Sequence, residues 1–141
     1  MAKAKLTGGK GADGSDSRCA CDSGGSFLAC CGPFLAGEAI APTAVALMRS
    51  RYTAFTRNNQ VYLQASWHPR TRPAAGSDEA SQAPCQWLGL QVLSYQQDGD
   101  QGTVEFIARY KTGGRAGRLH EVSRFVCEAG QWLYLDGTLL E

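Results

Sequence analysis

The sequence predicts an α+β protein: a small zinc-binding module followed by a domain in which helices pack on one face of a curved antiparallel sheet. Four cysteines fall within residues 19–31, a helical apolar periodicity follows, and four strand-like runs separated by turn residues occupy the second half. Helices followed by a run of strands are typical of the α+β class. A chain of 141 residues with 43% hydrophobic residues can bury one core of ordinary size.

Composition divides the chain into three parts. Residues 1–17 offer almost nothing to bury, so we expect a flexible tail. Residues 18–34 form the cysteine module, and residues 35–141 form the main domain. Inside the module we expect a short helical turn over residues 27–31 that Gly32, followed by proline, brings to an end.

The four clustered cysteines indicate a structural metal site. Zinc favours a closed tetrahedral shell of thiolates, and such a shell leaves no position for a substrate. A dense thiolate cluster in a chain of cytoplasmic character is more typical of a metal site than of a disulfide framework. The alternative is a set of reduced or redox-active thiols. The expected zinc ligands are Cys19, Cys21, Cys30 and Cys31.

Two helices are expected before the strands. The longer one begins near Pro42-Thr43 and runs to about Arg57, with a buried stripe at three- and four-residue spacing. Arg51 falls inside this apolar arc, whereas Ser50 points away. Asn58-Asn59 ends this helix and caps a second one, which runs from Gln60 to about Trp67. Residues 68–84 then form a long loop.

The second half predicts a four-stranded antiparallel meander. The runs are residues 87–95, 103–110, 119–127 and 131–135, and glycine-containing turns separate them. In the first run, Leu88, Leu90 and Val92 are expected on one side.

Four polar residues are candidates for a binding pocket. Arg51, Glu121 and Ser123 each fall on the apolar side of their element, which fits either a structural ion pair between Arg51 and Glu121 or the floor of a ligand pocket. His68 is either a pocket histidine or a residue that stabilises the end of a helix. His120 is expected to be solvated or paired across strands.

Composition also disfavours several functional classes. A formal charge of +1 does not provide the basic surface that nucleic-acid binding requires. Phosphate-loop and dinucleotide fingerprints are absent, as are secretory signals and stretches long enough to cross a membrane. We therefore expect a cytoplasmic protein with reduced thiols.

Two stretches resemble a known family. The segment CACDSGGSFLACC, residues 19–31, matches the SEC-C motif C-x-C-x8-C-C at all four ligands, although the motif's usual proline and lysines are replaced by Ala20 and by apolar residues. The segments APTAVALMRSRYTAF, YLQASWHP and LHEVSRFV resemble the YchJ-like family of small bacterial proteins. The resemblance spans residues 18–137 and implies a cone-shaped nuclear-transport-factor-2-like (NTF2-like) domain behind a SEC-C-type zinc segment. The family has no assigned activity.

Two functions are compatible with these residues. The first is a zinc-binding adaptor that contacts an unidentified protein partner through Phe27, Leu28 and Phe34, with a small-molecule pocket in the main domain. The alternative is a pocket enzyme of the isomerase or hydratase type, in which His68 acts as acid and base and Arg51 orients an anionic substrate. Relatives of the fold include homodimers, but no residue here argues for one.

Overall fold

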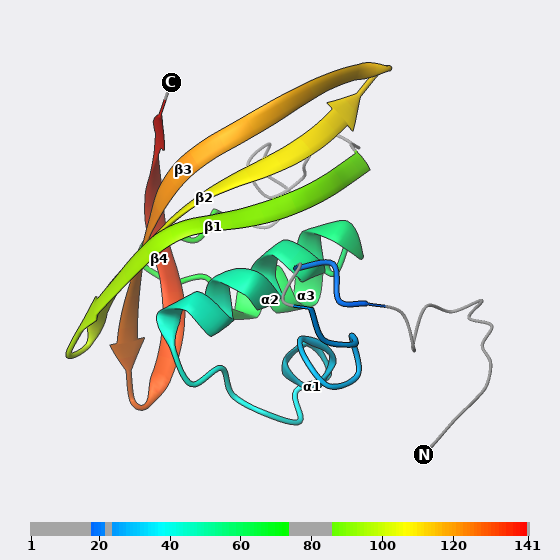
Figure 1. Ribbon diagram of the computed structural model, residues 1–141. Helices are drawn as coiled ribbons and strands as arrows, with labels where there is room; N and C mark the ends of the chain where they lie inside the picture. The colour runs from blue at the N-terminus through cyan, green and yellow to red at the C-terminus, as the bar shows by residue number, and fades with distance from the viewer. Residues whose placement is uncertain (1–17, 22–23, 74–85, 141) are drawn as a thin grey trace.

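A four-stranded antiparallel sheet curves over two helices, and a small N-terminal module packs against the longer helix (Figure 1). The computed structural model describes residues 18–21, 24–73 and 86–140. The predicted tail and most of the predicted long loop lie outside these residues. Within the described part, the order of helices and strands is the one that the sequence predicts.

The sheet is a meander in which sequential strands are neighbours, in the order β1-β2-β3-β4. Each connection is a two-residue turn, and residues with positive φ, most of them glycine, occupy all three turns. The strands are longer than the sequence indicated, because polar residues continue the ladder beyond the apolar runs. Their bounds are β1 Gln86–Asp98, β2 Gln101–Thr112, β3 Arg115–Glu128 and β4 Gln131–Leu140.

Strand β1 departs from simple alternation. The register jumps between Trp87 and Gly89, so Leu88 is an extra residue without a partner on β2. Leu88 is consequently 50% exposed, whereas Trp87 points inward and meets Tyr52 edge to face at 5.8 Å. The expectation that Leu88 shares the inner face with Leu90 is therefore wrong.

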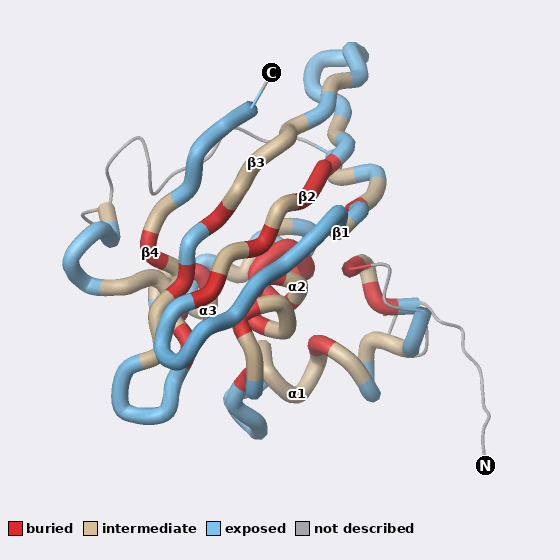
Figure 2. The backbone as a smooth tube through the Cα atoms, turned by 60° about the vertical axis from the view of Figure 1, so that its left-hand side comes forward, coloured by how far each residue is buried: buried red, intermediate tan, exposed pale blue. Residues whose placement is uncertain are grey.

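The longer helix, α2 (Ala44–Thr56), lies along the concave face of the sheet and forms the centre of the core (Figure 2). The Thr43 hydroxyl accepts a hydrogen bond from the Ala46 amide and caps the helix. Ser50 points away from the apolar arc, as expected, yet it is not exposed to solvent. Ser50 is fully buried and bonds to the Leu47 carbonyl and the Tyr62 hydroxyl, because further elements cover the side of α2 that faces away from the sheet.

The second helix, α3 (Gln60–Ala65), begins with an Asn59 cap on the Tyr62 amide, as predicted. It ends before Trp67, because the chain there turns to pair with β4. Residue Trp67 forms an isolated parallel bridge with Tyr134. The Tyr134 amide donates to the Ser66 carbonyl, and the His68 amide donates to the Tyr134 carbonyl.

The N-terminal module contains the short helix α1 (Gly32–Leu35). The sequence predicted a helical turn over residues 27–31 that ends at Gly32, and the structure reverses this order. Residues 27–31 form turns, and the helix begins at Gly32 with Pro33 in its first turn. Proline is tolerated there because backbone N–H groups of the first turn have no partner within the helix. None of the helices in the described residues has the length and apolar character that a membrane crossing requires.

Candidate metal centre and core cavity

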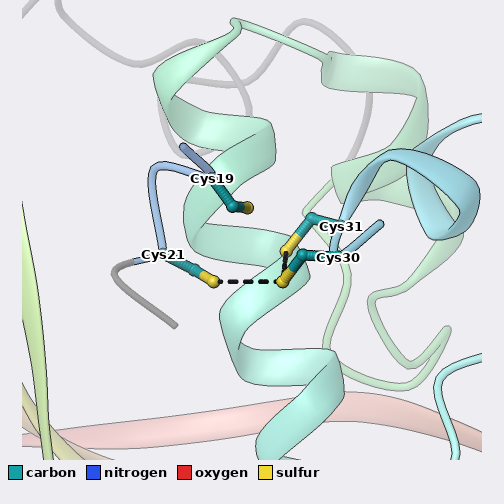
Figure 3. Close-up of side chains that lie close together, drawn as sticks. All are labelled: Cys19, Cys21, Cys30 and Cys31. Atoms are coloured by element: carbon teal, nitrogen blue, oxygen red, sulfur yellow. Dashed lines mark hydrogen bonds between the residues drawn. The ribbon is translucent and has the colours of Figure 1, made fainter. Parts of the chain in front are cut away.

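Four cysteine sulfurs converge beside α2 (Figure 3). Cys19 and Cys21 precede the turn at Gly24, while Cys30 and Cys31 directly precede α1. All four Sγ atoms lie within 4.8 Å of one another. The Cys21 and Cys30 sulfurs are 3.6 Å apart, and the Cys30 and Cys31 sulfurs are 3.8 Å apart.

These distances fit a tetrahedral thiolate site. For Zn–S bonds of ~2.3 Å, neighbouring sulfurs of a tetrahedron lie ~3.8 Å apart. The thiols also influence each other: hydrogen bonds from Cys21 and Cys31 lower the pKa of the Cys19 thiol, and the same network raises the pKa of Cys31. The network therefore favours the thiolate form, which binds metal, at Cys19 and the thiol form at Cys31. The residues predicted as ligands are brought together into one site.

Helix α2 holds the cysteine module in place. The Arg49 guanidinium donates to the Cys21 carbonyl at 2.6 Å, and the Thr53 hydroxyl lies 3.5 Å from the Cys19 sulfur. The Arg57 guanidinium stacks over the Phe27 ring at 3.6 Å from its centroid. Three of the four cysteines are buried in this contact and belong to the same core cluster as α2. The module is therefore packed on its own main domain.

A cavity of about 350 Å³ lies on the opposite side of α2, against the sheet. Most of its lining is aromatic or aliphatic, and its polar groups come from α2, β3, β4 and the segment after α3. The lining residues that matter for its chemistry are Arg51, Trp67, Ala108, Glu121, Ser123 and Tyr134. Three of the four predicted pocket residues therefore line one cavity.

Arg51 is only 6% exposed, and one of its guanidinium nitrogens, Nη1, is hydrogen-bonded inside the protein. Its Nη1 donates to the Leu63 carbonyl at 2.9 Å and to the Ser66 hydroxyl at 2.7 Å. The guanidinium stacks over the rings of Tyr134, at 4.5 Å, and Trp67, at 5.2 Å. Burial lowers the pKa of Arg51 to about 10, which leaves it charged at neutral pH.

Glu121 faces the same cavity from β3. Its carboxylate accepts a hydrogen bond of 2.7 Å from the Ser123 hydroxyl. Burial, reinforced by the neighbouring Glu121 charge, raises the pKa of Tyr134 to about 12. Among the ion pairs between described residues, none joins Arg51 to Glu121. Of the two alternatives drawn from the sequence, the ion pair is therefore absent from the described residues, and each group meets neutral partners instead.

His68 does not reach the cavity. Because Trp67 and His68 are consecutive residues of a strand-like segment on β4, their side chains point to opposite sides, and Trp67 takes the inner one. The His68 Nε2 lies 2.9 Å from the Glu128 carboxylate, and its Nδ1 accepts from the Arg70 amide. His120 pairs across strands with Glu105 at 2.7 Å, as predicted.

One residue that lines the cavity, Trp67, and one glycine beside it, Gly137, escaped the sequence analysis. Trp67 appeared only as the end of a helix, yet its indole Nε1 is buried without a hydrogen-bond partner in the described structure. Gly137 lies on β4 opposite Ser123, and a Cβ there would overlap the Glu121 carboxylate. An isolated glycine within a strand often marks such a close approach, which is the signal that was available.

Comparison with known proteins agrees with this architecture. Residues 43–137 match the family model described as YchJ, middle NTF2-like domain. The chain belongs to the YchJ-like family. A UPF0225 protein of Ralstonia nicotianae is 49% identical over 131 residues, which cover 86% of this chain and 90% of the relative. A UPF0225 protein of Polaromonas naphthalenivorans is 54% identical over 112 residues, 79% of this chain and 80% of the relative.

Two solved structures of SEC-C motif containing proteins share the fold of this YchJ-like chain. The solution structure of a Rhodopseudomonas palustris protein has a TM-score of 0.80 at 36% identity and covers 87% of this chain and 98% of its own. The crystal structure of a Psychrobacter arcticus protein has a TM-score of 0.72 at 26% identity, with coverages of 91% and 85%. The NTF2-like fold and the resemblance noted in the sequence are confirmed.

Proposed function

We propose that this YchJ-like protein is a cytoplasmic zinc protein whose four-cysteine site fixes the N-terminal module on α2. The convergence of four sulfurs within 4.8 Å supports this more than any other observation. A four-thiolate shell has no open coordination position, so the ion would be structural. Bound there, it would replace the core that the module is too small to form alone.

Metal analysis of the purified protein tests this proposal. We expect one zinc per chain in the wild type and its loss in Cys30→Ser, because a serine hydroxyl is a poor zinc ligand. Cys127→Ser is the matched control, since Cys127 is a free, half-buried cysteine of β3 outside the cluster. Iron instead of zinc, or equal metal loss in both variants, would contradict the assignment.

We also propose that the module contacts a protein partner. Leu28 supports this because it is 55% exposed on the module, whereas Arg57 covers Phe27 and Phe34 packs against the core. In affinity capture, Leu28→Ser should lose a specific partner that the wild type retains. Val61→Ser, which changes an exposed apolar residue of α3, is the control. A partner lost equally from both variants, or from neither, would refute the proposal.

The cavity supports a third element of the proposal, the binding of a small molecule. Its volume of about 350 Å³ lies within the range of ligand sites, about 300–1,000 Å³, and it combines an apolar lining with a few polar groups. The alternative that pairs Arg51 with His68 in catalysis is not retained, because His68 lies outside this cavity.

A further inference from the structure

The polar groups of the cavity carry opposite charges that do not touch. Arg51 supplies a buried guanidinium, and Glu121 supplies a carboxylate. The hydrogen bonds of Arg51 go to neutral oxygens, and Glu121 interacts with the neutral hydroxyls of Ser123 and Tyr134. Buried charges normally pair with each other or with a ligand. The cavity therefore offers hydrogen-bond donors on one side and acceptors on another, with no net charge.

A third group adds to the donor side. The indole N–H of Trp67 is buried, and no hydrogen-bond partner for it exists among the described residues. A buried donor without an acceptor costs free energy comparable to a lost hydrogen bond. The Arg51 guanidinium stacks on this same ring at 5.2 Å. Arg51 and Trp67 both line the cavity, so this stacked pair forms the donor side of the site.

The position of Glu121 is also built into the backbone. Gly137 faces its carboxylate across the β3–β4 ladder, and any larger residue at that position would displace it. The Ser123 hydroxyl holds one of its oxygens at 2.7 Å. The glycine thus leaves room for the Glu121 carboxylate, and the Ser123 hydroxyl holds it there.

We propose that the cavity binds an uncharged small molecule with an apolar body and a planar amide-type head. The head's carbonyl would accept from Arg51 and Trp67, and its N–H would donate to Glu121. A carboxylate ligand would leave net negative charge beside Glu121, and a cationic ligand would leave net positive charge beside Arg51, both in a site with an apolar lining. This inference rests on the proposed ligand-binding role of the cavity and specifies its ligand class.

Three probes of one shape test this ligand class: phenylpropanamide, phenylpropanoate and phenylpropanamidine. They share the same apolar body and differ in a planar head that is neutral, anionic or cationic. Titration calorimetry on the full chain should show that the amide binds at least about tenfold more tightly than either charged probe, the usual effect of one hydrogen bond to a charged group. Heteronuclear NMR should show a shift of the Trp67 indole N–H, while that of Trp132, which does not line this cavity, stays unchanged.

Two variants make the test specific. Ala108→Leu places a larger side chain at a buried position that lines the cavity, and it should abolish binding of all three probes. Glu121→Gln removes the negative charge and should make phenylpropanoate the preferred probe, because the site then carries only the charge of Arg51.

The outcomes separate the two levels of the proposal. Tighter binding of a charged probe that Ala108→Leu abolishes would overturn the ligand class and leave the cavity as a binding site. Binding that survives Ala108→Leu, or no binding of any probe to folded, metal-loaded protein, would overturn the inference together with the cavity's binding role. Zinc content, measured on the same samples, reports independently on the metal site.

Discussion

Replacing Arg51 by methionine should destabilise the protein, but only moderately. The change removes two hydrogen bonds from a charged donor, to the Leu63 carbonyl and the Ser66 hydroxyl. Such bonds contribute about 1.5–3 kcal/mol each, so the loss is about 3–6 kcal/mol. The lowering of the Arg51 pKa to about 10 means that burial disfavours its charged form by about 3 kcal/mol, a cost that methionine does not have. The net expectation is a destabilisation of about 0–3 kcal/mol.

Urea unfolding followed by tryptophan fluorescence measures this difference. The three tryptophans report on the core. If the slope of the unfolding free energy against urea concentration is the same in wild type and variant, the two can be compared as two-state proteins. Arg109→Met, at an exposed position of β2, serves as the control and should stay within about 0.5 kcal/mol of the wild type. A variant at Arg51 that is more stable than the wild type would refute the reasoning, since the buried arginine would then contribute nothing to the fold.

Three further predictions follow from single contacts. Arg49→Gln should weaken zinc binding in a chelator competition, because the charged bond to the Cys21 carbonyl is lost; unchanged affinity would show that α2 does not position the module. Gly102→Ala should lower the free energy of unfolding by about 1–3 kcal/mol, because the new Cβ would meet the Ala44 Cβ at 2.7 Å; wild-type stability would mean that α2 shifts without cost. Tyr134→Phe should reduce the loss of stability between pH 10 and 12. The pKa of Tyr134 is raised in the fold to about 12, so its hydroxyl stabilises the fold below pH 10 and this contribution disappears as pH rises through 12. Alkaline unfolding curves of wild type and variant that coincide would contradict this cause.

The sequence predicts the order of the elements because their signals are local. The Asn59 cap and the glycine-containing turns lie next to the backbone groups that they satisfy, and both are found as predicted. The longer helix begins close to the expected Pro42-Thr43, with Thr43 as its cap. The four cysteines carry a spacing that specifies their convergence before any fold is known. Local signals are therefore sufficient for the order of the elements and for the convergence of the four cysteines.

Errors arise where tertiary contacts override periodicity. The helical periodicity placed Ser50 outside the apolar arc but gave no sign of its burial, which arises because α3 covers that side of α2 and the Tyr62 hydroxyl gives Ser50 a partner. Leu88 was placed inside, but a register jump in β1 turns it outward. His68 became a pocket candidate because the side of the chain that faces the cavity depends on the pairing of Trp67 with β4, a long-range contact without a local signal.

Helix α2 connects the two proposed sites. Arg49 and Thr53 touch the cysteine module from one side, while Arg51 lines the cavity from another. Only one or two residues separate these contacts along a single helix, so a displacement of α2 by a ligand must also move the groups that hold Cys19 and Cys21. Coupling between two binding events is reciprocal. If the amide probe changes the affinity for zinc by displacing α2, zinc must therefore change the affinity for the amide by the same factor.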